Sequence, residues 1–129
     1  MKIIVAGSRT YKHHQHVYMV LDGIVQKSDI VIQGGARGVD SIAAAWARTR
    51  GVACRTVQPE WETFGKAAGP RRNAQMAREA DALVAFWDGL SPGTGDMIRQ
   101  MQRLKKPIFF ARYDAKELDM PRNFMYDSN

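Results

Sequence analysis

The sequence predicts an α/β protein of Rossmann-like type, with a doubly wound parallel sheet of about five strands and helices on both faces. Two observations predict this fold class. Short, mostly apolar runs alternate along the chain with segments of helical spacing. The connections between them are short, and strands that alternate with helices form parallel sheets covered on both sides.

Five runs have the length and composition of strands. They lie at residues 3–7, 29–35, 52–57, 82–87 and 107–111. The first two are β-branched and end in glycine, as buried parallel strands do, and the next two repeat the pattern. We therefore expect strands buried within the sheet. Cys54, the single cysteine, lies in the third run and is expected to be a small buried side chain.

Four segments between these runs have helical spacing. They lie at residues 16–26, 39–50, 73–79 and 94–105. In the first, Val17, Val20 and Leu21 share one face. The segment 112–129 departs from the pattern and is expected to be an irregular tail. We therefore predict a single domain over residues 1–129, with its core in residues 2–111.

The composition excludes several classes of protein. With 129 residues, 45% of them hydrophobic and 25% charged, the chain lies in the ordinary globular range, which excludes disordered, collagen-like and disulfide-rich classes. The apolar run at the N-terminus is too short for a signal sequence or a membrane span, so we expect no membrane association and a cytoplasmic location.

The chain is basic, with 19 Lys and Arg against 13 Asp and Glu and a net charge of +6. This surplus raises the encounter rate with any polyanion, whether nucleotide or nucleic acid. The basic residues are scattered, however, and form no arm or stripe of the kind that dedicated nucleic-acid binders carry.

Three polar loops follow the first, second and fourth predicted strands. The first loop contains Gly7, Ser8, Arg9 and Thr10, and the second contains Gly34, Gly35, Ala36, Arg37, Gly38 and Asp40. The third follows Trp87 and contains Asp88, Ser91, Gly93, Thr94 and Gly95. Because the carboxyl ends of parallel strands meet at one edge of the sheet, we expect these residues to line one ligand site.

The second and third loops suit an anion. Glycine lets the backbone approach a ligand closely, and a helix that begins directly after the loop points free N–H groups at it. Thr94 is predicted as a helix N-cap, and the hydroxyls of Ser91 and Thr94 can donate to phosphate. The alternative is that these glycines only make the tight turns that any doubly wound fold needs. The polar residues beside them favour a ligand that bridges both helix starts.

The segment 59–76 is predicted to be the longest irregular stretch and is placed to act as a lid over this edge. Trp61 could stack on a base, while Arg71 or Arg72 could donate to phosphate or a ribose hydroxyl. Asn73, which directly follows them and begins the third predicted helix, is also expected to bind the ligand. The alternative is that the aromatic side chains cover the core and the arginines face water.

The acidic and histidine residues have simpler interpretations. Asp40 and Asp96 open helices, where a carboxylate is favourable for capping alone. Asp88 is the preferred ligand for a ribose diol. The histidines between residues 13 and 16 match no zinc-site spacing and are expected to form a solvated helix start, so no metal site and no cofactor are predicted.

Several motifs in order resemble the SLOG superfamily, and most of all its small YspA- and YpsA-related members. They are GSR after the first strand, GGARGVDSIAAAWA, the Pro-x-Trp at residues 59–61, AGPRRNAQM and ADALVAFWDGLSPGTGDMI. The resemblance covers residues 2–110. It implies a Rossmann-like fold that binds nucleotides or nucleotide-derived signals, and relatives commonly form homo-oligomers.

The resemblance also implies two alternative functions. Related lonely-guy enzymes cleave nucleoside monophosphates to base and ribose 5-phosphate with an arginine, which Arg72 matches, and a glutamate, whose position here is Met97. This reaction would need Asp96 or Asp88 in place of the glutamate. DNA-processing relatives imply single-stranded nucleic-acid binding. The expected function is a nucleotide-ligand sensor or sequestering protein, with these two as alternatives.

Overall fold

The computed structural model describes residues 1–111 and contains one parallel five-stranded sheet, in the order β3-β2-β1-β4-β5. The strands are β1 (Lys2–Gly7), β2 (Ile30–Gln33), β3 (Ala53–Thr56), β4 (Ala82–Phe86) and β5 (Ile108–Phe110). This confirms the predicted Rossmann-like α/β class and the strand count. The predicted irregular tail, residues 112–129, lies outside the described residues.

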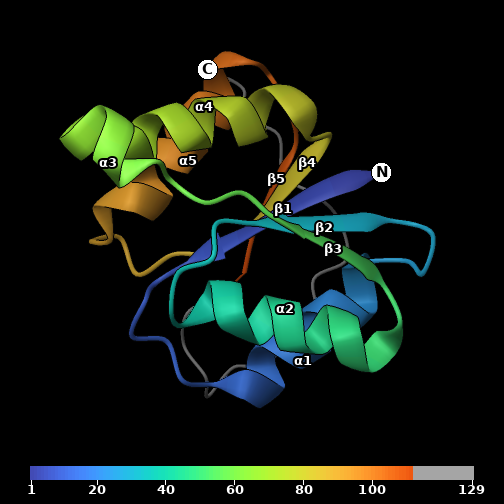
Figure 1. Cartoon of the computed structure of the whole chain (residues 1–129). Helices are drawn as coiled ribbons and strands as arrows, with labels where there is room; N and C mark the ends of the chain where they lie inside the picture. Colours follow the sequence, from blue (N-terminus) through green and yellow to red (C-terminus); the bar gives the residue numbers. More distant parts are fainter. Residues whose placement is uncertain (112–129) are drawn as a thin grey trace.

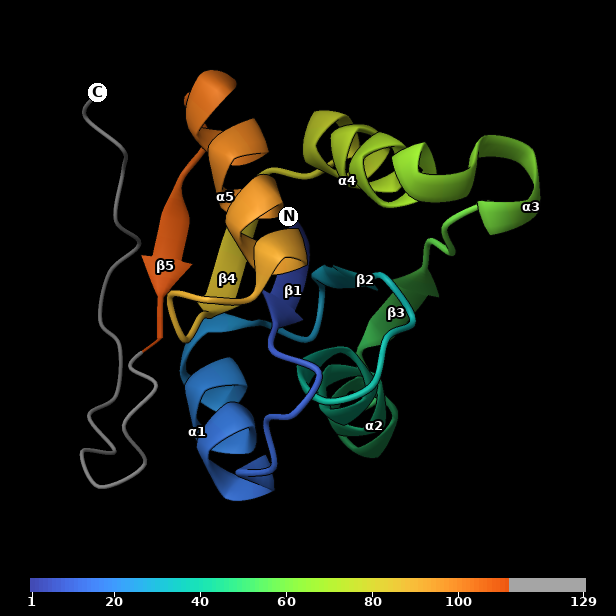
Figure 2. The same cartoon turned by 90° about the vertical axis from the view of Figure 1, so that its left-hand side faces the viewer.

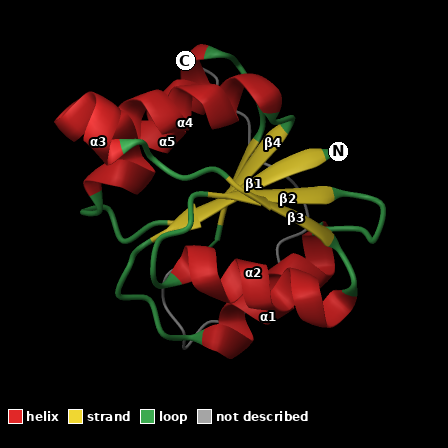
Figure 3. Cartoon of the chain, viewed as in Figure 1, coloured by secondary structure: helices red, strands yellow, loops and turns green. Residues whose placement is uncertain are grey.

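Helices cover both faces of the sheet (Figures 1 and 2). On one face lie α1 (His14–Ile24) and α2 (Val39–Arg50), and on the other lie α4 (Ala68–Glu79) and α5 (Pro92–Arg103). A short helix, α3 (Trp61–Phe64), and a 3₁₀ turn, η1 (Gly65–Ala67), lead into α4. Figure 3 shows that loops occupy only the connections between these elements.

The prediction of an irregular segment at residues 59–76 was wrong. Most of it is helical, and α4 begins at Ala68, five residues before the predicted helix at 73–79. Gly69 and Pro70 lie in the first turn of α4. Proline is tolerated in the first turn of a helix, because the N–H that it lacks would have no partner there in any case.

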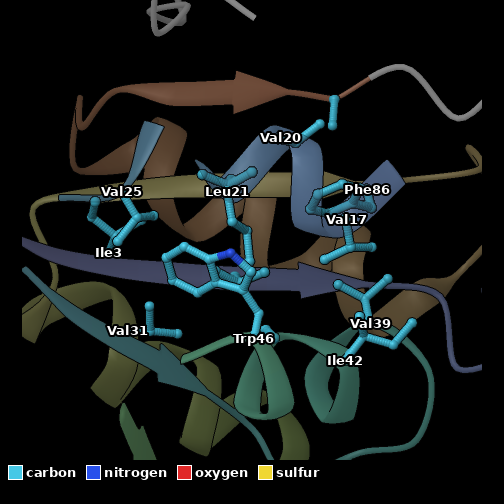
Figure 4. Packing of buried hydrophobic residues seen from close by; sticks show 14 of the residues in the cluster. Ile3, Val17, Val20, Leu21, Val25, Val31, Val39, Ile42, Trp46 and Phe86 are labelled. Carbon is cyan, nitrogen blue, oxygen red and sulfur yellow. The ribbon is translucent and has the colours of Figure 1, made fainter. Parts of the chain in front are cut away.

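Side chains of β1 alternate between two cores. Ile3 and Val5 pack with α1 and α2, whereas Ile4 packs with α4 and α5. Trp46 of α2 fills the centre of the first core (Figure 4), and its indole Nε1 donates to Asp22 of α1 at 2.8 Å. Because successive side chains of a strand point to opposite faces of the sheet, the same strand packs against both helical layers.

Strand β3 departs from the prediction because it is an edge strand. It pairs with β2, and all four of its residues are exposed, including Cys54, which was expected to be buried. The apolar residues at the two ends of the predicted run 52–57 lie just outside the strand. An ion pair between Arg55 and Glu79 connects this edge to α4.

The prediction of a solvated histidine cluster was wrong for His16. This side chain is buried against Phe86, and its Nδ1 hydrogen-bonds with the hydroxyl of Tyr11. Burial lowers the pKa of His16, with a smaller contribution from His13. His13 and His14 are exposed, as expected.

Lys106 caps the C-terminal end of α4. Its Nζ donates to the carbonyl oxygens of Ala77 and Ala80 at 2.7 Å and of Arg78 at 3.0 Å. A cation is favourable where helix carbonyls lack partners. We expect Lys106→Met to lower the free energy of unfolding by about 1–2 kcal/mol, because three carbonyls lose a charged donor. Urea unfolding measures this change.

Lys105→Met is the matched control, because it removes the same charge from the neighbouring exposed side chain. We expect it to change the free energy of unfolding by less than about 0.5 kcal/mol. Equal effects of the two substitutions would show that overall charge, rather than the capping contacts, determines the loss.

Candidate functional site

A cleft of about 600 Å³ opens at the carboxyl ends of β1 and β4. The chain runs from β1 to β2 on one side of the sheet and returns to β4 on the other, so the strand order reverses between β1 and β4. Ligands of doubly wound proteins bind at this kind of switch point. The strands direct their loops into the space between the helical layers (Figure 2).

Most of the residues predicted for the site line this cleft. They are Gly7, Ser8, Arg9, Thr10, Gly34, Ala36, Asp40, Arg72, Asn73, Asp88, Ser91, Gly93 and Thr94. Sequence reasoning missed Val5, Ala6, Met76, Leu90 and Pro92 as lining residues, and it noted Met97 only as the position of an absent glutamate. Met76 and Met97 are apolar helical residues, for which a core role was the natural prediction.

The other predicted residues do not line this cleft. Gly35, Arg37 and Trp61 line a smaller cleft beside it, and Arg71 lines a third cleft, of about 460 Å³, next to α4. Gly38, Trp87, Gly95 and Asp96 line none of the three clefts. The structure therefore divides the predicted residues among neighbouring surfaces rather than gathering all of them around one ligand.

Arg72 holds the second loop against the end of β3. Its Nη1 donates to the carbonyl oxygen of Gly34 at 2.8 Å and of Val57 at 3.4 Å, while its Nε is buried without a partner. Burial lowers the pKa of this guanidinium, although Asp40 opposes the shift. A Cβ on Gly34 would lie 1.9 Å from Nη1, so this approach requires glycine. Arg72 lines all three clefts and forms the wall between them.

Asp40 lies at the floor of the cleft and is 7% exposed. Its Oδ2 accepts from the backbone N–H of Gly34 at 3.1 Å and of Ala36 at 3.2 Å. Asp40 was expected to cap the helix that it opens; instead its carboxylate braces the loop before α2. Burial raises the pKa of Asp40 to about 6, against the opposing effects of these N–H groups and of Arg72.

This pKa predicts a pH-dependent stability. Because the folded-state pKa is above the unfolded value of 3.8, the stabilisation by protonated Asp40 is full below pH 3.8 and is lost as the pH rises through about 6. We expect the stability of Asp40→Asn relative to the wild type to rise by about 3 kcal/mol across this interval. The amide oxygen can still accept the two N–H bonds. Urea unfolding of both proteins from pH 3.5 to pH about 7 measures this difference, and a flat difference would contradict the assignment.

The loop after β4 is held by its own polar side chains. Asp88 Oδ1 accepts from the N–H of Leu90 at 2.8 Å and of Ser91 at 2.9 Å, and these bonds lower the pKa of Asp88. Trp87 Nε1 donates to the carbonyl oxygen of Ser91 at 3.0 Å. These contacts form a turn that presents the start of α5 to the cleft. They engage Oδ1 of Asp88, one of the two oxygens of the carboxylate that is predicted to bind a ribose.

Helix α5 begins earlier than expected, at Pro92, with Ser91 as its N-cap. Thr94 is therefore not the N-cap but a buried residue in the first turn. No side chain within the described chain caps this helix, so the N–H groups of Gly93 and Thr94 are available to a ligand. Asn73 fixes the turn by donating to the carbonyl oxygen of Gly93 at 3.1 Å and to Asp96 Oδ2 at 2.9 Å.

The cleft combines hydrogen-bond donors with two carboxylates that already have backbone partners. Arg9, Thr10 and the first turn of α5 supply donors, and the two carboxylates in the lining, Asp40 and Asp88, both accept backbone N–H groups. Met97, at the position for which the resemblance implies a glutamate, lines the cleft, and Asp96 accepts a hydrogen bond from Asn73. Within residues 1–111, no group of three or more His, Cys, Asp or Glu is arranged to hold a metal ion.

Fold and cleft together define a Rossmann-like protein with a crevice at its switch point. The sequence profile of the YspA, cpYpsA-related SLOG family matches residues 1–64. Gene 61 protein of Mycobacterium phage D29 is 36% identical over 116 residues, which cover 83% of this chain and 93% of that protein. The chain belongs to the YspA, cpYpsA-related SLOG family.

Solved structures share the fold at low sequence identity. DNA processing protein A (DprA) from Streptococcus pneumoniae has a TM-score of 0.71 and 18% identity, over 83% of this chain and 48% of that chain. DprA from Helicobacter pylori has a TM-score of 0.68 and 18% identity, over 84% and 63%. The structural genomics target TM1055 has a TM-score of 0.65 and 21% identity, over 83% and 71%.

These likenesses establish the fold alone. The chain spans about half the length of the S. pneumoniae protein and 63% of that of the H. pylori protein. No helix within the described part of the chain is both long and apolar enough to cross a membrane.

Proposed function

We propose that this protein binds a nucleotide or nucleotide-derived ligand in the cleft between β1 and β4 and acts as a sensor or a sequestering protein. The observation that carries the proposal is the uncapped start of α5 facing a cleft of about 600 Å³. Backbone N–H groups and the helix dipole favour an anion there, and clefts of this volume hold nucleotide-sized ligands.

The cleft offers separate surfaces to the parts of such a ligand. Its phosphate would bind the N–H groups of Gly93 and Thr94, with Arg9 as the charged donor from the opposite loop. The apolar side chains of Met76 and Met97 would contact the sugar or base. This division supports binding more than N-glycosidic cleavage. Met97 occupies the glutamate position, Asp96 is paired with Asn73, and Asp88 Oδ1 already accepts two backbone N–H groups.

A second candidate function is binding of single-stranded nucleic acid. It is favoured by the structural likeness to the H. pylori DNA processing protein, whose structure was determined for its mode of binding single-stranded DNA. The arginines around the clefts, among them Arg9, Arg37 and Arg71, suit a phosphate backbone. A steep loss of affinity with salt would distinguish this function from binding of a small nucleotide.

Gly93→Asp tests the main proposal. A Cβ at Gly93 meets no atom within 4 Å, and a carboxylate in the first turn of α5 is favourable for the helix. We therefore expect unchanged or slightly higher stability and at least a tenfold loss of nucleotide affinity, because the carboxylate repels the phosphate. Thermal shift against nucleoside monophosphates, ADP-ribose, NAD and cyclic nucleotides identifies the ligand class, and titration of the variant then measures the loss.

Gly93→Ala is the matched control, because it adds the same Cβ without charge and is expected to reduce affinity less. Undiminished binding by Gly93→Asp would contradict the placement of the phosphate. Chromatography of each incubated ligand shows whether it stays intact, as a binding protein requires, or releases its base.

A further inference from the structure

A second cleft, of about 240 Å³, lies beside the first on the other side of the loop after β2. The two clefts share Arg9, Gly34, Ala36 and Arg72. We call the second one the Trp61 cleft; its remaining lining residues are Gly35, Arg37, Gln58, Pro59 and Trp61. Because the two clefts adjoin at these shared residues, one ligand that passes over them could occupy both.

Trp61 is the unusual side chain of this cleft. It is 53% exposed and packs into neither hydrophobic core. The far edge of its indole, Cη2, lies 3.7 Å from the Cβ position of Gly69 at the start of α4, so the ring rests against that helix. A large aromatic ring that the core does not need, held at the edge of a cleft, is a surface on which a base can stack.

The charges of the Trp61 cleft suit a phosphate group. Arg9, Arg37 and Arg72 line it, and its lining contains no acidic residue, whereas the first cleft contains Asp40 and Asp88. Arg9 and Arg72 lie where the two clefts meet. A phosphate at this junction would be near both guanidinium groups, with groups attached on either side of it extending into the two clefts.

The wall of the Trp61 cleft is fixed before any ligand arrives. Gly35 has a φ of +77°, and an added Cβ would lie 2.8 Å from Nε2 of Gln58, so the loop packs directly on this side chain. Arg72 holds the same loop through the carbonyl oxygen of Gly34. A preformed cleft loses less conformational entropy on binding than a mobile one.

We propose that the Trp61 cleft binds the second nucleotide unit of a ligand in which a phosphodiester joins two nucleotides. One unit occupies the first cleft, the linking phosphate lies between Arg9 and Arg72, and the second base stacks on Trp61. This inference rests on the proposed nucleotide binding in the first cleft. The same chemistry occurs in a free dinucleotide and at the 5′ end of a single strand.

Isothermal titration with three probes tests the inference on the full chain. The probes are deoxyadenosine monophosphate, the 5′-phosphorylated dinucleotide of deoxyadenosine and a 5′-phosphorylated oligonucleotide of about ten deoxyadenosines. We expect the dinucleotide to bind more tightly than the monophosphate. Trp61→Ala should weaken dinucleotide binding about tenfold and leave the monophosphate unchanged. Trp61→Phe should restore most of the affinity, because a phenyl ring still stacks.

A second variant addresses the charge. Arg37 is exposed and has no contact with the first cleft, so Arg37→Ala should weaken the dinucleotide severalfold and leave the monophosphate unchanged. An oligonucleotide that binds more tightly than the dinucleotide, with a steep salt dependence, identifies a strand end as the source of the ligand. If the dinucleotide binds as tightly as the oligonucleotide or more tightly, the source of the ligand is a free dinucleotide.

The outcomes separate this inference from the proposed function. The inference is overturned if the monophosphate binds as tightly as the dinucleotide, or if Trp61→Ala changes both affinities equally or neither. In those cases nucleotide binding in the first cleft stands. If the wild-type protein binds none of the three probes, nucleotide binding itself fails, and the inference fails with it.

Discussion

Replacing Arg72 by alanine is expected to lower the free energy of unfolding by about 2–4 kcal/mol and to abolish detectable ligand binding. The carbonyl oxygens of Gly34 and Val57 lose a charged donor that lies 2.8 Å and 3.4 Å away. Asp40 also loses the cation that favours its ionised form. The second loop, which forms part of both clefts, is then no longer held against the end of β3.

Arg71→Ala is the control for the removal of charge. Arg71 is exposed, and its guanidinium stacks on the ring of Phe64 at 3.9 Å from the centroid. An exposed contact of this kind contributes about 0.5–1 kcal/mol, so we expect a much smaller loss than at Arg72. Guanidinium chloride unfolding measures both variants. Equal losses would contradict the special role of Arg72.

A double variant tests whether Arg72 acts through Asp40. Arg72→Ala removes the cation that favours the ionised form of Asp40, so the buried carboxyl keeps its charge only at a higher free-energy cost. In an Asp40→Asn background there is no such charge, so Arg72→Ala should destabilise the protein less. Additive losses of free energy in the double variant would show that the two side chains are independent.

The order of strands and helices could be predicted from sequence because each element carries its own local pattern. Helix α2 has the predicted bounds, since Gly38 precedes it and Gly51 ends it in a left-handed conformation. The edge position of β3 could not be predicted, because a strand lies at an edge or in the interior according to which other strands pair with it. That pairing is set by the whole sheet and not by the residues of the strand itself. The early start of α4 was not predicted. Proline is tolerated in the first turn of a helix but not in its interior, and the local sequence does not show which of these positions Pro70 occupies.

The location of the cleft followed from the rule for parallel sheets, whereas the contacts of its side chains did not. Loops after β1, β2 and β4 do meet in one cleft. Asp40 and Asp96 both looked like helix caps, yet one braces a loop and the other pairs with Asn73. Side-chain direction depends on the packing of several elements, which no local pattern records. The Trp61 cleft was missed as a separate surface for the same reason.

Gly38→Ala is expected to be the most destabilising glycine substitution of the site, with a loss of at least about 3 kcal/mol. Gly38 has φ +72° and ψ −128°, a conformation that L residues rarely adopt. An added Cβ would lie 2.2 Å from the carbonyl oxygen of Ser8 and 2.6 Å from the carbonyl group of Arg9. These are backbone atoms, so rotation of a side chain cannot relieve the overlap.

Gly51→Ala separates this overlap from the backbone strain. Gly51 has a similar φ of +70°, but an added Cβ would meet only the end of the Lys27 side chain, with Cε at 3.6 Å and Nζ at 3.9 Å, which are ordinary contacts. We expect a loss of about 1 kcal/mol there, from conformation alone. Similar losses at both positions, measured by urea unfolding, would contradict a steric role for Gly38.

The same overlap should affect the ligand. The N–H of Val39 donates to the carbonyl oxygen of Ser8 at 3.2 Å, so the loops after β1 and β2 are in direct contact beside Gly38. A Cβ there must push these loops apart, which moves Arg9 away from the start of α5. If both groups hold one phosphate, Gly38→Ala must lose affinity in the fraction that remains folded, whereas Gly51→Ala must keep it.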